Sequence, residues 1–266
     1  MNNITIGYLS WKRHDILTQT LQSHKSNGLF DLIKPQNRII FFQELSKEDI
    51  DIANNFECAY IGDSNNIGIL DGFIKLVDKS NTEYFIFSEN DWYLIENNDV
   101  TKKILEDCIE LLNKDLCDVI RLRHRKNPGN PLYSQPKNTD DWLQQDVSNF
   151  PYKLESLTWV DEPNKVYKNE LTEFNGNYKW YITTLNHQKW SNNIFIAKTS
   201  YLKNALLPLI KNFSNNNNYY LGLEDILINY KKYLGKDLDF DKIINNYDKI
   251  RIGAGDGLFT HKDFIL

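Results

Sequence analysis

The segment Tyr84-Phe-Ile-Phe-Ser-Glu-Asn-Asp-Trp-Tyr93 joins a short apolar run to two carboxylates. Residues 84–87 are aromatic or β-branched, which is typical of a strand buried on both faces of a parallel sheet. Glu89 and Asp91 follow at once, and ligands of open α/β sheets bind at the carboxyl ends of the strands. Two acids placed there can share a divalent cation, such as Mg²⁺ or Mn²⁺, that holds substrate phosphates. The alternative is an ordinary acidic turn after a strand.

Strand-like and helix-like patterns alternate on both sides of this segment. Such alternation predicts an α/β fold in which helices flank a mainly parallel central sheet. The turn after the first strand has no GxGxxG pattern, so a Rossmann dinucleotide site is not expected. The further strands are expected at residues 4–9, 38–42, 59–62, 118–122, 181–185 and 193–197.

Three later regions depart from this regular alternation. Residues 126–179 lose the apolar period and gain Pro, Asn, Gly and Trp, which indicates a long structured insertion. Residues 221–233 have helical spacing, with Glu224 and Asp225 in the first turn. The glycine-rich segment 251–261 is expected to form a shaped loop.

Composition excludes several functional classes. The formal net charge of −5 over 266 residues favours neither nucleic-acid binding nor attachment to an acidic membrane. No run of eighteen apolar residues and no secretory signal is present, so we expect a soluble, cytoplasmic protein without an integral membrane segment. Cys58, Cys108 and Cys117 lack a CxxC spacing and are expected to be buried thiols.

The order of these motifs resembles that of the GT-A fold nucleotide-sugar glycosyltransferases, in particular the family-2-like group. The resemblance covers nearly the whole chain except residues 126–179, and Ser88-Glu-Asn-Asp-Trp92 looks like the DxD-type motif with Glu in place of the first Asp. It implies one GT-A-like domain over residues 1–266. Residues 1–125 would bind the nucleotide-sugar, and residues 126–266 would bind the acceptor and carry the catalytic base.

The resemblance implies a metal-dependent reaction with Mn²⁺ or Mg²⁺. A cation would neutralise the charge that develops on the leaving diphosphate. Asp91 would be the direct ligand, and Glu89 would face the ribose or a metal-bound water. His261 matches a late histidine ligand, and one imidazole is compatible with Mn²⁺. The alternative for His261 is an exposed residue of the tail.

Two loops would contact the donor in such an enzyme. Asn65, Asn66 and Gly68 resemble a loop that packs beside the nucleotide base, although Asn and Gly also simply form turns. Ser10 and Arg13 follow the first strand, where the base and diphosphate are held. Arg13 is equally consistent with a charge on a helix surface.

Glu224 and Asp225 resemble the acidic pair of inverting members of the family. A carboxylate suffices as the general base for an acceptor hydroxyl, and Asp225 is the preferred candidate with Glu224 as the alternate. Both acids would also be favourable at a helix N-terminus without any catalytic role. In a retaining enzyme the assignment to Asp225 would fail.

Residues for the acceptor are less defined. Arg123 belongs to a basic cluster at a strand end and could pair with phosphate or an anionic acceptor, or balance nearby acids. Trp190 could lie against a sugar ring, although aromatic residues more often belong to the core.

The resemblance therefore implies transfer of a sugar, from a UDP- or GDP-linked donor, to a hydroxyl group of a glycan, a protein or another acceptor. A nucleotidyltransferase and a catalytically inactive sugar- or nucleotide-binding protein are the alternatives.

Overall fold

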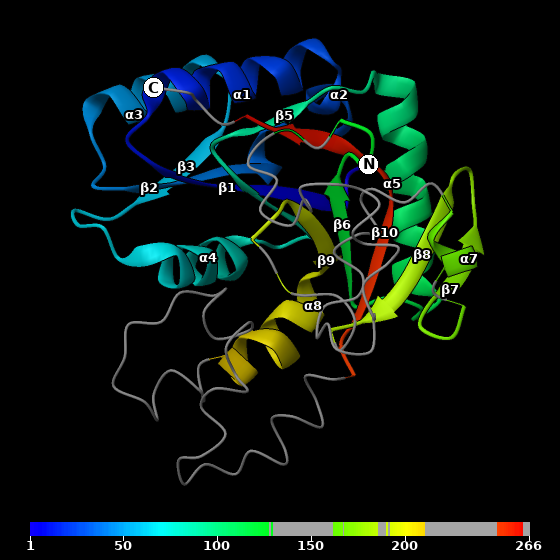
Figure 1. Ribbon diagram of the computed structural model, residues 1–266. Coiled ribbons are helices and arrows are strands. Elements are labelled where there is room, and N and C mark those ends of the chain that lie inside the picture. The colour runs from blue at the N-terminus through cyan, green and yellow to red at the C-terminus, as the bar shows by residue number, and fades with distance from the viewer. Residues whose placement is uncertain are drawn as a thin grey trace, which may run out of the picture.

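The computed structural model describes residues 1–127, 129, 162–166, 168–185, 190, 192–210 and 249–262. In this part of the chain ten strands form one sheet, with helices packed on both of its faces (Figure 1). The strand order is β3-β2-β1-β4-β9-β6-β10-β8-β7, and β5 pairs with β10 beside this path. The strands are β1 (Ile4–Trp11), β2 (Arg38–Gln43), β3 (Ala59–Gly62), β4 (Tyr84–Glu89), β5 (Trp92–Leu94), β6 (Val119–Arg123), β7 (Thr172–Asn175), β8 (Lys179–Thr184), β9 (Phe195–Lys198) and β10 (Arg251–His261).

The first half of the sheet is parallel. β1 pairs in parallel with both β2 and β4, and β2 pairs in parallel with β3. β9 then runs antiparallel between β4 and β6, so that β6 and its parallel partner β10 point in the same direction as β4. The predicted α/β architecture with a central, mostly parallel sheet is confirmed.

Two apolar cores form because successive side chains of a strand point to opposite faces. In β4, Tyr84 and Ile86 enter one core, whereas Phe85 and Phe87 enter the other. The first core is covered by α1 (His14–Ser26), α2 (Leu29–Leu32), α3 (Lys47–Asn55) and α5 (Asn98–Asn113). The second is covered by α4 (Gly68–Lys79) and by the helical segment that begins with α8 (Thr199–Tyr201) and continues as a π-helical turn (Leu202–Leu206). Figure 1 shows α1 and α3 on the side of the sheet opposite α4 and α8.

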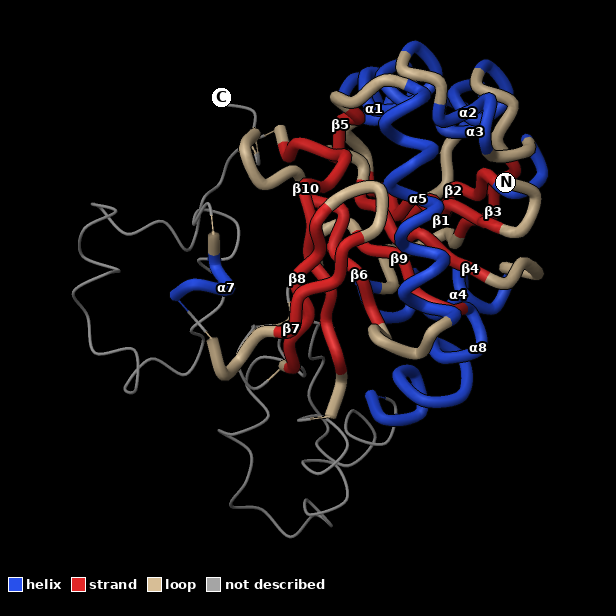
Figure 2. Tube along the Cα trace, turned by 90° about the vertical axis from the view of Figure 1, so that its right-hand side faces the viewer, coloured by secondary structure: helices blue, strands red, loops and turns tan. Residues whose placement is uncertain are grey.

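Part of the predicted insertion is described. Within residues 126–179 the structure places the short helix α7 (Pro163–Val166) and the edge strand β7, which pairs with β8 (Figure 2). The helix predicted at residues 221–233 lies outside the described residues. The three cysteines are free and buried, as predicted.

The prediction of a glycine-rich loop before residue 261 was wrong. Residues 251–261 form β10, which lies inside the sheet between β6 and β8. The pairing of β10 with β6 shifts between Ala254 and Phe259, which marks a bulge. Gly257 lies in this bulge with a φ of 74°, and a Cβ atom there would collide with the backbone of Arg123. The glycines therefore allow close strand packing and do not form a loop.

The helices of the described ranges include none that is long and apolar enough to cross a membrane.

We predict that Gly257→Ala lowers the free energy of unfolding by at least about 2 kcal/mol, because it combines a left-handed backbone with a backbone collision. Gly68→Ala is the matched control, since Gly68 has a φ of 83° but no atom within 4 Å of the position that a Cβ would take. It should cost only about 1 kcal/mol. Urea denaturation of both variants measures the difference, and equal losses would contradict the role assigned to the bulge.

Candidate active site

The candidate residues gather at one edge of the sheet. β1, β2, β4, β6 and β10 all point the same way, so their carboxyl ends meet at this edge. Asp91 lies in the two-residue turn that joins β4 to β5. The sheet therefore brings the acidic turn beside the loop after β1 and beside the end of β10.

The Asp91 carboxylate is the centre of this arrangement. Asp91 is 8% exposed, and its Oδ2 atom lies 3.4 Å from Arg13 Nη1 and 3.5 Å from His261 Nε2. Its Oδ1 atom is buried without a hydrogen-bond partner among the described residues. A buried carboxylate oxygen is normally paired with a donor or a cation, so Oδ1 is available to a ligand.

His261 reaches Asp91 through strand pairing. It lies opposite Trp92 in the antiparallel pair of β10 and β5, and the two rings pack at a centroid distance of 4.7 Å. The backbone N–H of Lys262 donates to the carbonyl oxygen of Asp91 at 3.1 Å. His261 is thus an ordered part of the site, and the alternative of an exposed tail residue is wrong.

Arg123 also lies against Trp92. Its guanidinium carbon is 5.4 Å from the centroid of the Trp92 ring. The guanidinium donates to Asn193 Oδ1 at 3.2 Å and to the Gly129 carbonyl oxygen at 3.0 Å. Arg123 is therefore next to the acidic turn, in a held position.

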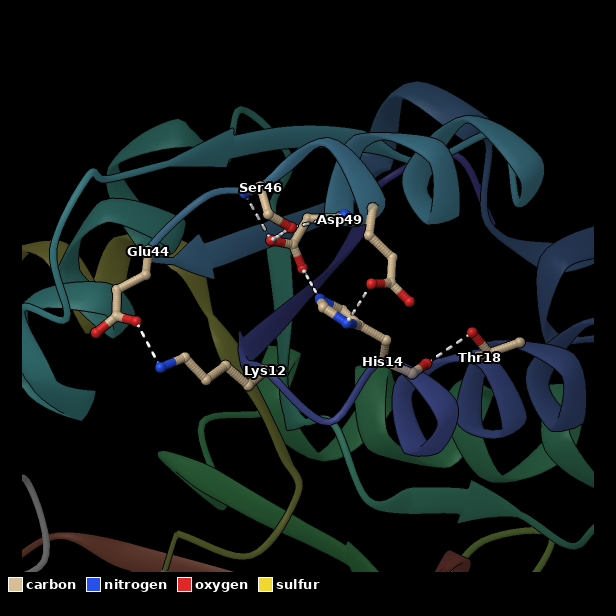
Figure 3. Close-up of polar contacts among 7 residues, drawn as sticks. Lys12, His14, Thr18, Glu44, Ser46 and Asp49 are labelled. Atoms are coloured by element: carbon tan, nitrogen blue, oxygen red, sulfur yellow. Dashed lines mark hydrogen bonds and ion pairs between the residues drawn. The ribbon is translucent and has the colours of Figure 1, made fainter.

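The loop that carries Arg13 has an unusual backbone. Lys12 and Arg13 have φ values of 52° and 58°, and Glu44 after β2 has a φ of 54°. Non-glycine residues in this left-handed region are uncommon and cost about 1–2 kcal/mol each. Lys12 Nζ contacts Glu44 Oε2 at 2.8 Å (Figure 3), and this hydrogen bond lowers the pKa of Glu44. The ion pair joins the left-handed residues that follow β1 to the one that follows β2.

A second set of contacts joins the starts of α1 and α3. His14 Nε2 lies 2.9 Å from Asp49 Oδ1, and His14 Nδ1 lies 3.1 Å from Glu48 Oε2. Asp49 also forms a capping box with Ser46 at the start of α3 (Figure 3). Because His14 directly follows Arg13, these contacts anchor the loop that directs Arg13 to Asp91.

Ser10 and Glu89 lie close to the acidic turn in the sheet register. Leu9 is paired with Glu89, and β1 continues to Trp11, so Ser10 belongs to the strand and not to the predicted turn. Ser10 is 2% exposed, and its Oγ atom has no partner in the described part of the chain. Glu89 is the half-buried last residue of β4. No three Asp, Glu, His or Cys side chains within the described ranges form a group that could hold a metal ion.

The Asn65–Gly68 region is an exposed turn at the start of α4. Asn66 Oδ1 accepts from the N–H of Gly68 at 2.9 Å, and the Asn65 N–H donates to Asp63 Oδ1 at 3.1 Å. Gln43, the last residue of β2, accepts from the N–H of Ile67 at 2.8 Å. The turn chemistry of Asn and Gly accounts for this loop, which lies after β3 on the same edge of the sheet.

Trp190 does not form a surface for a sugar. It is 2% exposed and packs against Phe195 in the second core, at a ring centroid distance of 5.3 Å. The apolar area of the indole is therefore already buried, and the core alternative is the observed one. Glu224 and Asp225 lie outside the described residues, so their predicted roles stay predictions.

A buried histidine next to the acidic turn was not predicted from the sequence. His24 of α1 is fully buried, its Nε2 atom lies 2.8 Å from the Trp92 carbonyl oxygen, and its Nδ1 atom lies 2.7 Å from Tyr8 Oη. Burial lowers the pKa of His24 to about 4. The available signal was the polar pair Thr20 and His24, four residues apart on the face of α1 that also carries Leu17 and Leu21.

We predict that His24 makes the protein less stable as the pH falls from about 6.5 to about 4. In this window the unfolded chain binds a proton at His24 that the folded chain does not bind. The loss should reach roughly 3 kcal/mol, since the pKa is about 4 in the fold and about 6.5 in the unfolded chain. Urea denaturation across this pH range measures it. In His24→Gln the contribution should disappear, and an unchanged pH dependence would contradict the assignment.

Comparison with known proteins bears on the fold. No family model and no curated protein matches the sequence. Among solved structures, TarS 1–349 from S. aureus superposes with a TM-score of 0.51 at 12% identity, over 98% of this chain and 60% of that chain. The complex of TarS 1–349 with UDP gives the same TM-score and identity, over 99% and 61%. A mycobacterial protein gives 0.50 at 10% identity, over 100% and 69%.

This chain thus spans about three fifths of the length of the TarS structures that it matches. The likeness is one of fold, because the identities are low. The TarS structures have the GT-A fold. The chain described here therefore has the GT-A fold that its sequence motifs predicted.

Proposed function

We propose that the protein is a divalent-cation-dependent glycosyltransferase that transfers a sugar from a nucleoside-diphosphate sugar to a hydroxyl acceptor. The observation that carries this proposal is the Asp91 carboxylate. It lies at the carboxyl end of the central strand β4, between Arg13 and His261, with one buried oxygen that has no partner in the described residues. A UDP complex of TarS, which shares the fold, favours a uridine nucleotide as the donor.

The donor atoms present fit a hard divalent cation. A carboxylate oxygen of Asp91 and the imidazole of His261 are ligands that Mn²⁺ accepts. Mg²⁺ and Mn²⁺ commonly keep several waters and take further ligands from substrate phosphates, so a large protein cage is not needed. When bound, the cation would neutralise the charge that develops on the leaving diphosphate. Glu89 would orient the ribose or a metal-bound water from the end of β4.

The cationic side chains at this edge would assist. The Arg13 side chain is 50% exposed, and its ion pair with Asp91 at 3.4 Å is long and partly solvated, so it stabilises the fold little. Its guanidinium can therefore turn toward a diphosphate without a large cost in stability. Arg123, beside Trp92, would meet a phosphate or an anionic acceptor group from the β6 side.

The remaining parts follow from the motif order. The loop with Asn65, Asn66 and Gly68 and the end of β1 at Ser10 would border the nucleotide base. Asp225 would remove the proton of the acceptor hydroxyl in an inverting reaction, with Glu224 as the alternate base. The acceptor would be chosen largely by the region after residue 125.

The experiment that tests this proposal is a thermal-shift and donor-hydrolysis screen. UDP-, GDP-, dTDP- and CMP-sugars are each tested with Mn²⁺, with Mg²⁺ and with EDTA. A shift with one nucleotide that disappears in EDTA supports the proposal and names the donor. No shift with any donor would favour a binding protein without transferase activity, and release of diphosphate from a nucleoside triphosphate would favour a nucleotidyltransferase.

Asp91→Asn should abolish the effect of Mn²⁺ on UDP affinity, because the amide cannot supply the charge that a cation requires. We expect UDP binding in Mn²⁺ to weaken by about 100-fold or more, since loss of supporting contacts to metal ligands alone costs 10–100-fold. Isothermal titration with and without Mn²⁺ measures this. Asp99→Asn, at an exposed position in the first turn of α5, is the matched control. Unchanged UDP affinity of Asp91→Asn in Mn²⁺ would remove the central claim.

Asp225→Asn should leave donor binding near that of the wild type and reduce sugar transfer by about 10²–10⁴-fold, the usual effect of losing a general base. Transfer is measured with the donor identified by the screen, and UDP affinity is measured in parallel. Normal turnover in this variant, together with a large loss in Glu224→Gln, would reassign the base to Glu224.

A further inference from the structure

One face of α1 presents polar side chains to the segment that carries Asp91. These side chains lie three and four residues apart and so share one side of the helix. All of them are at least partly buried, where apolar residues would normally pack, and a buried polar group is costly unless it is hydrogen-bonded. The members of this polar face are Thr20, Ser23, His24 and Asn27, the residue that ends the helix.

Three consecutive carbonyl groups around Asp91 are held by donors. Thr20 Oγ1 donates to the carbonyl oxygen of Asn90 at 2.7 Å. The His24 ring contacts the carbonyl oxygen of Trp92 at 2.8 Å. Between them, the N–H of Lys262 donates to the carbonyl oxygen of Asp91 itself at 3.1 Å. The peptide planes on both sides of Asp91 are thus fixed by α1 together with Lys262, the residue that follows β10.

The polar face also supplies β5 with hydrogen bonds that a second neighbouring strand would otherwise provide. This three-residue strand pairs with β10. Beside α1, Ser23 Oγ accepts from the N–H of Leu94 at 3.1 Å, and Asn27 Nδ2 donates to the carbonyl oxygen of Leu94 at 2.7 Å. Helix side chains therefore satisfy backbone groups that would otherwise lack partners in the interior.

The direction of the His24 hydrogen bond follows from chemistry. A carbonyl oxygen can only accept, so Nε2 carries the proton that is donated to Trp92. Nδ1 then accepts from the hydroxyl of Tyr8, which lies 2.7 Å away on β1. The low pKa that burial gives His24 keeps this neutral tautomer in place near pH 7. The contact is thus a fixed link between β1, α1 and the acidic turn.

We infer that Thr20 and His24 are positioning residues that hold the Asp91 carboxylate in the orientation needed for a divalent cation and a diphosphate. Neither side chain contacts the carboxylate, so both act through the neighbouring peptide groups. Sites of this kind require placement within about 0.5 Å, and residues that support metal ligands typically affect metal affinity by 10–100-fold. The expected effect on cation and diphosphate binding rests on the proposed function, whereas the positioning of Asp91 does not.

The test compares Thr20→Val with variants that lose a similar hydrogen bond elsewhere. Valine has the shape of threonine without the donor, and Thr20→Ser restores the donor. Thr183→Val is the control for a buried threonine, because Thr183 Oγ1 donates to the carbonyl oxygen of Glu170 at 2.9 Å, away from the acidic turn. Thr18→Val is the control on α1, because Thr18 donates to the His14 carbonyl oxygen within the same helix.

Two readouts are measured on the full chain. Hydrogen exchange of the amides in residues 91–94 should accelerate at least ten-fold in Thr20→Val and stay near the wild-type rate in Thr183→Val. UDP affinity in Mn²⁺ should fall by about 10–100-fold in Thr20→Val, return to within about two-fold in Thr20→Ser, and stay unchanged in both controls.

Loss of UDP binding and loss of a positioned turn have different signatures in these two readouts. If the wild type shows no Mn²⁺-dependent binding of any nucleotide of the donor screen, the proposed function fails, and hydrogen exchange still decides whether Thr20 holds the turn. If the wild type binds UDP in Mn²⁺ but Thr20→Val matches Thr183→Val in both readouts, the positioning role is wrong. If Thr20→Val does not fold while Thr183→Val does, the same two readouts are measured on Thr20→Ala instead.

Discussion

A buried carboxylate needs compensation, and this requirement organises the candidate site. Asp91 is almost fully buried, yet among the described residues only one of its two oxygens faces nitrogen atoms, those of Arg13 Nη1 and His261 Nε2. The other oxygen has no partner among the described residues. A protein stabilised for folding alone would pair that oxygen or expose it. The free-energy cost of burying an unpaired carboxylate oxygen is consistent with a binding site for a ligand.

The loops around Asp91 have strained backbone conformations, which contacts at this edge of the sheet stabilise. Lys12, Arg13 and Glu44 all have left-handed backbones, and each lies at the carboxyl end of β1 or β2. Strained residues of this kind cluster at sites where geometry matters, and they persist only where surrounding contacts define them. Here the contacts are the Lys12–Glu44 ion pair and the attachment of His14 to Asp49. They fix the direction in which Arg13 leaves the sheet.

The polar face of α1 gives the acidic turn a second support besides strand pairing. Two donors from α1 and one from the chain after β10 meet three successive carbonyl groups. Such a support is rigid because Thr20 and His24 sit on a helix packed against the same sheet. Hydrogen bonds in the interior, which look purely structural, thus help to orient the Asp91 carboxylate at the edge of the sheet.

The period of apolar residues was enough to predict the fold class and most of the elements, because this period reflects which faces become buried. The run at Tyr84 predicted β4, and the Glu89–Asp91 pair was placed correctly at its carboxyl end. The glycine-rich segment was wrongly predicted to be a loop. Glycines that permit close strand packing, such as Gly257, contribute nothing to an apolar period. Trp190 stayed ambiguous because an indole suits both a core and a sugar-binding surface.

Which distant groups meet depends on the long-range pairing and packing of the chain. The pairing of β10 with β5 brings His261 to Asp91, and the packing of α1 brings His24 to Trp92. Neither contact can be derived from the period of apolar residues, since each depends on strand order and on the face that a helix turns inward, and the meeting of His261 with Asp91 was expected only from the family resemblance. A polar residue on a buried face signals that a partner exists, but the identity of that partner is settled by the long-range packing of the chain.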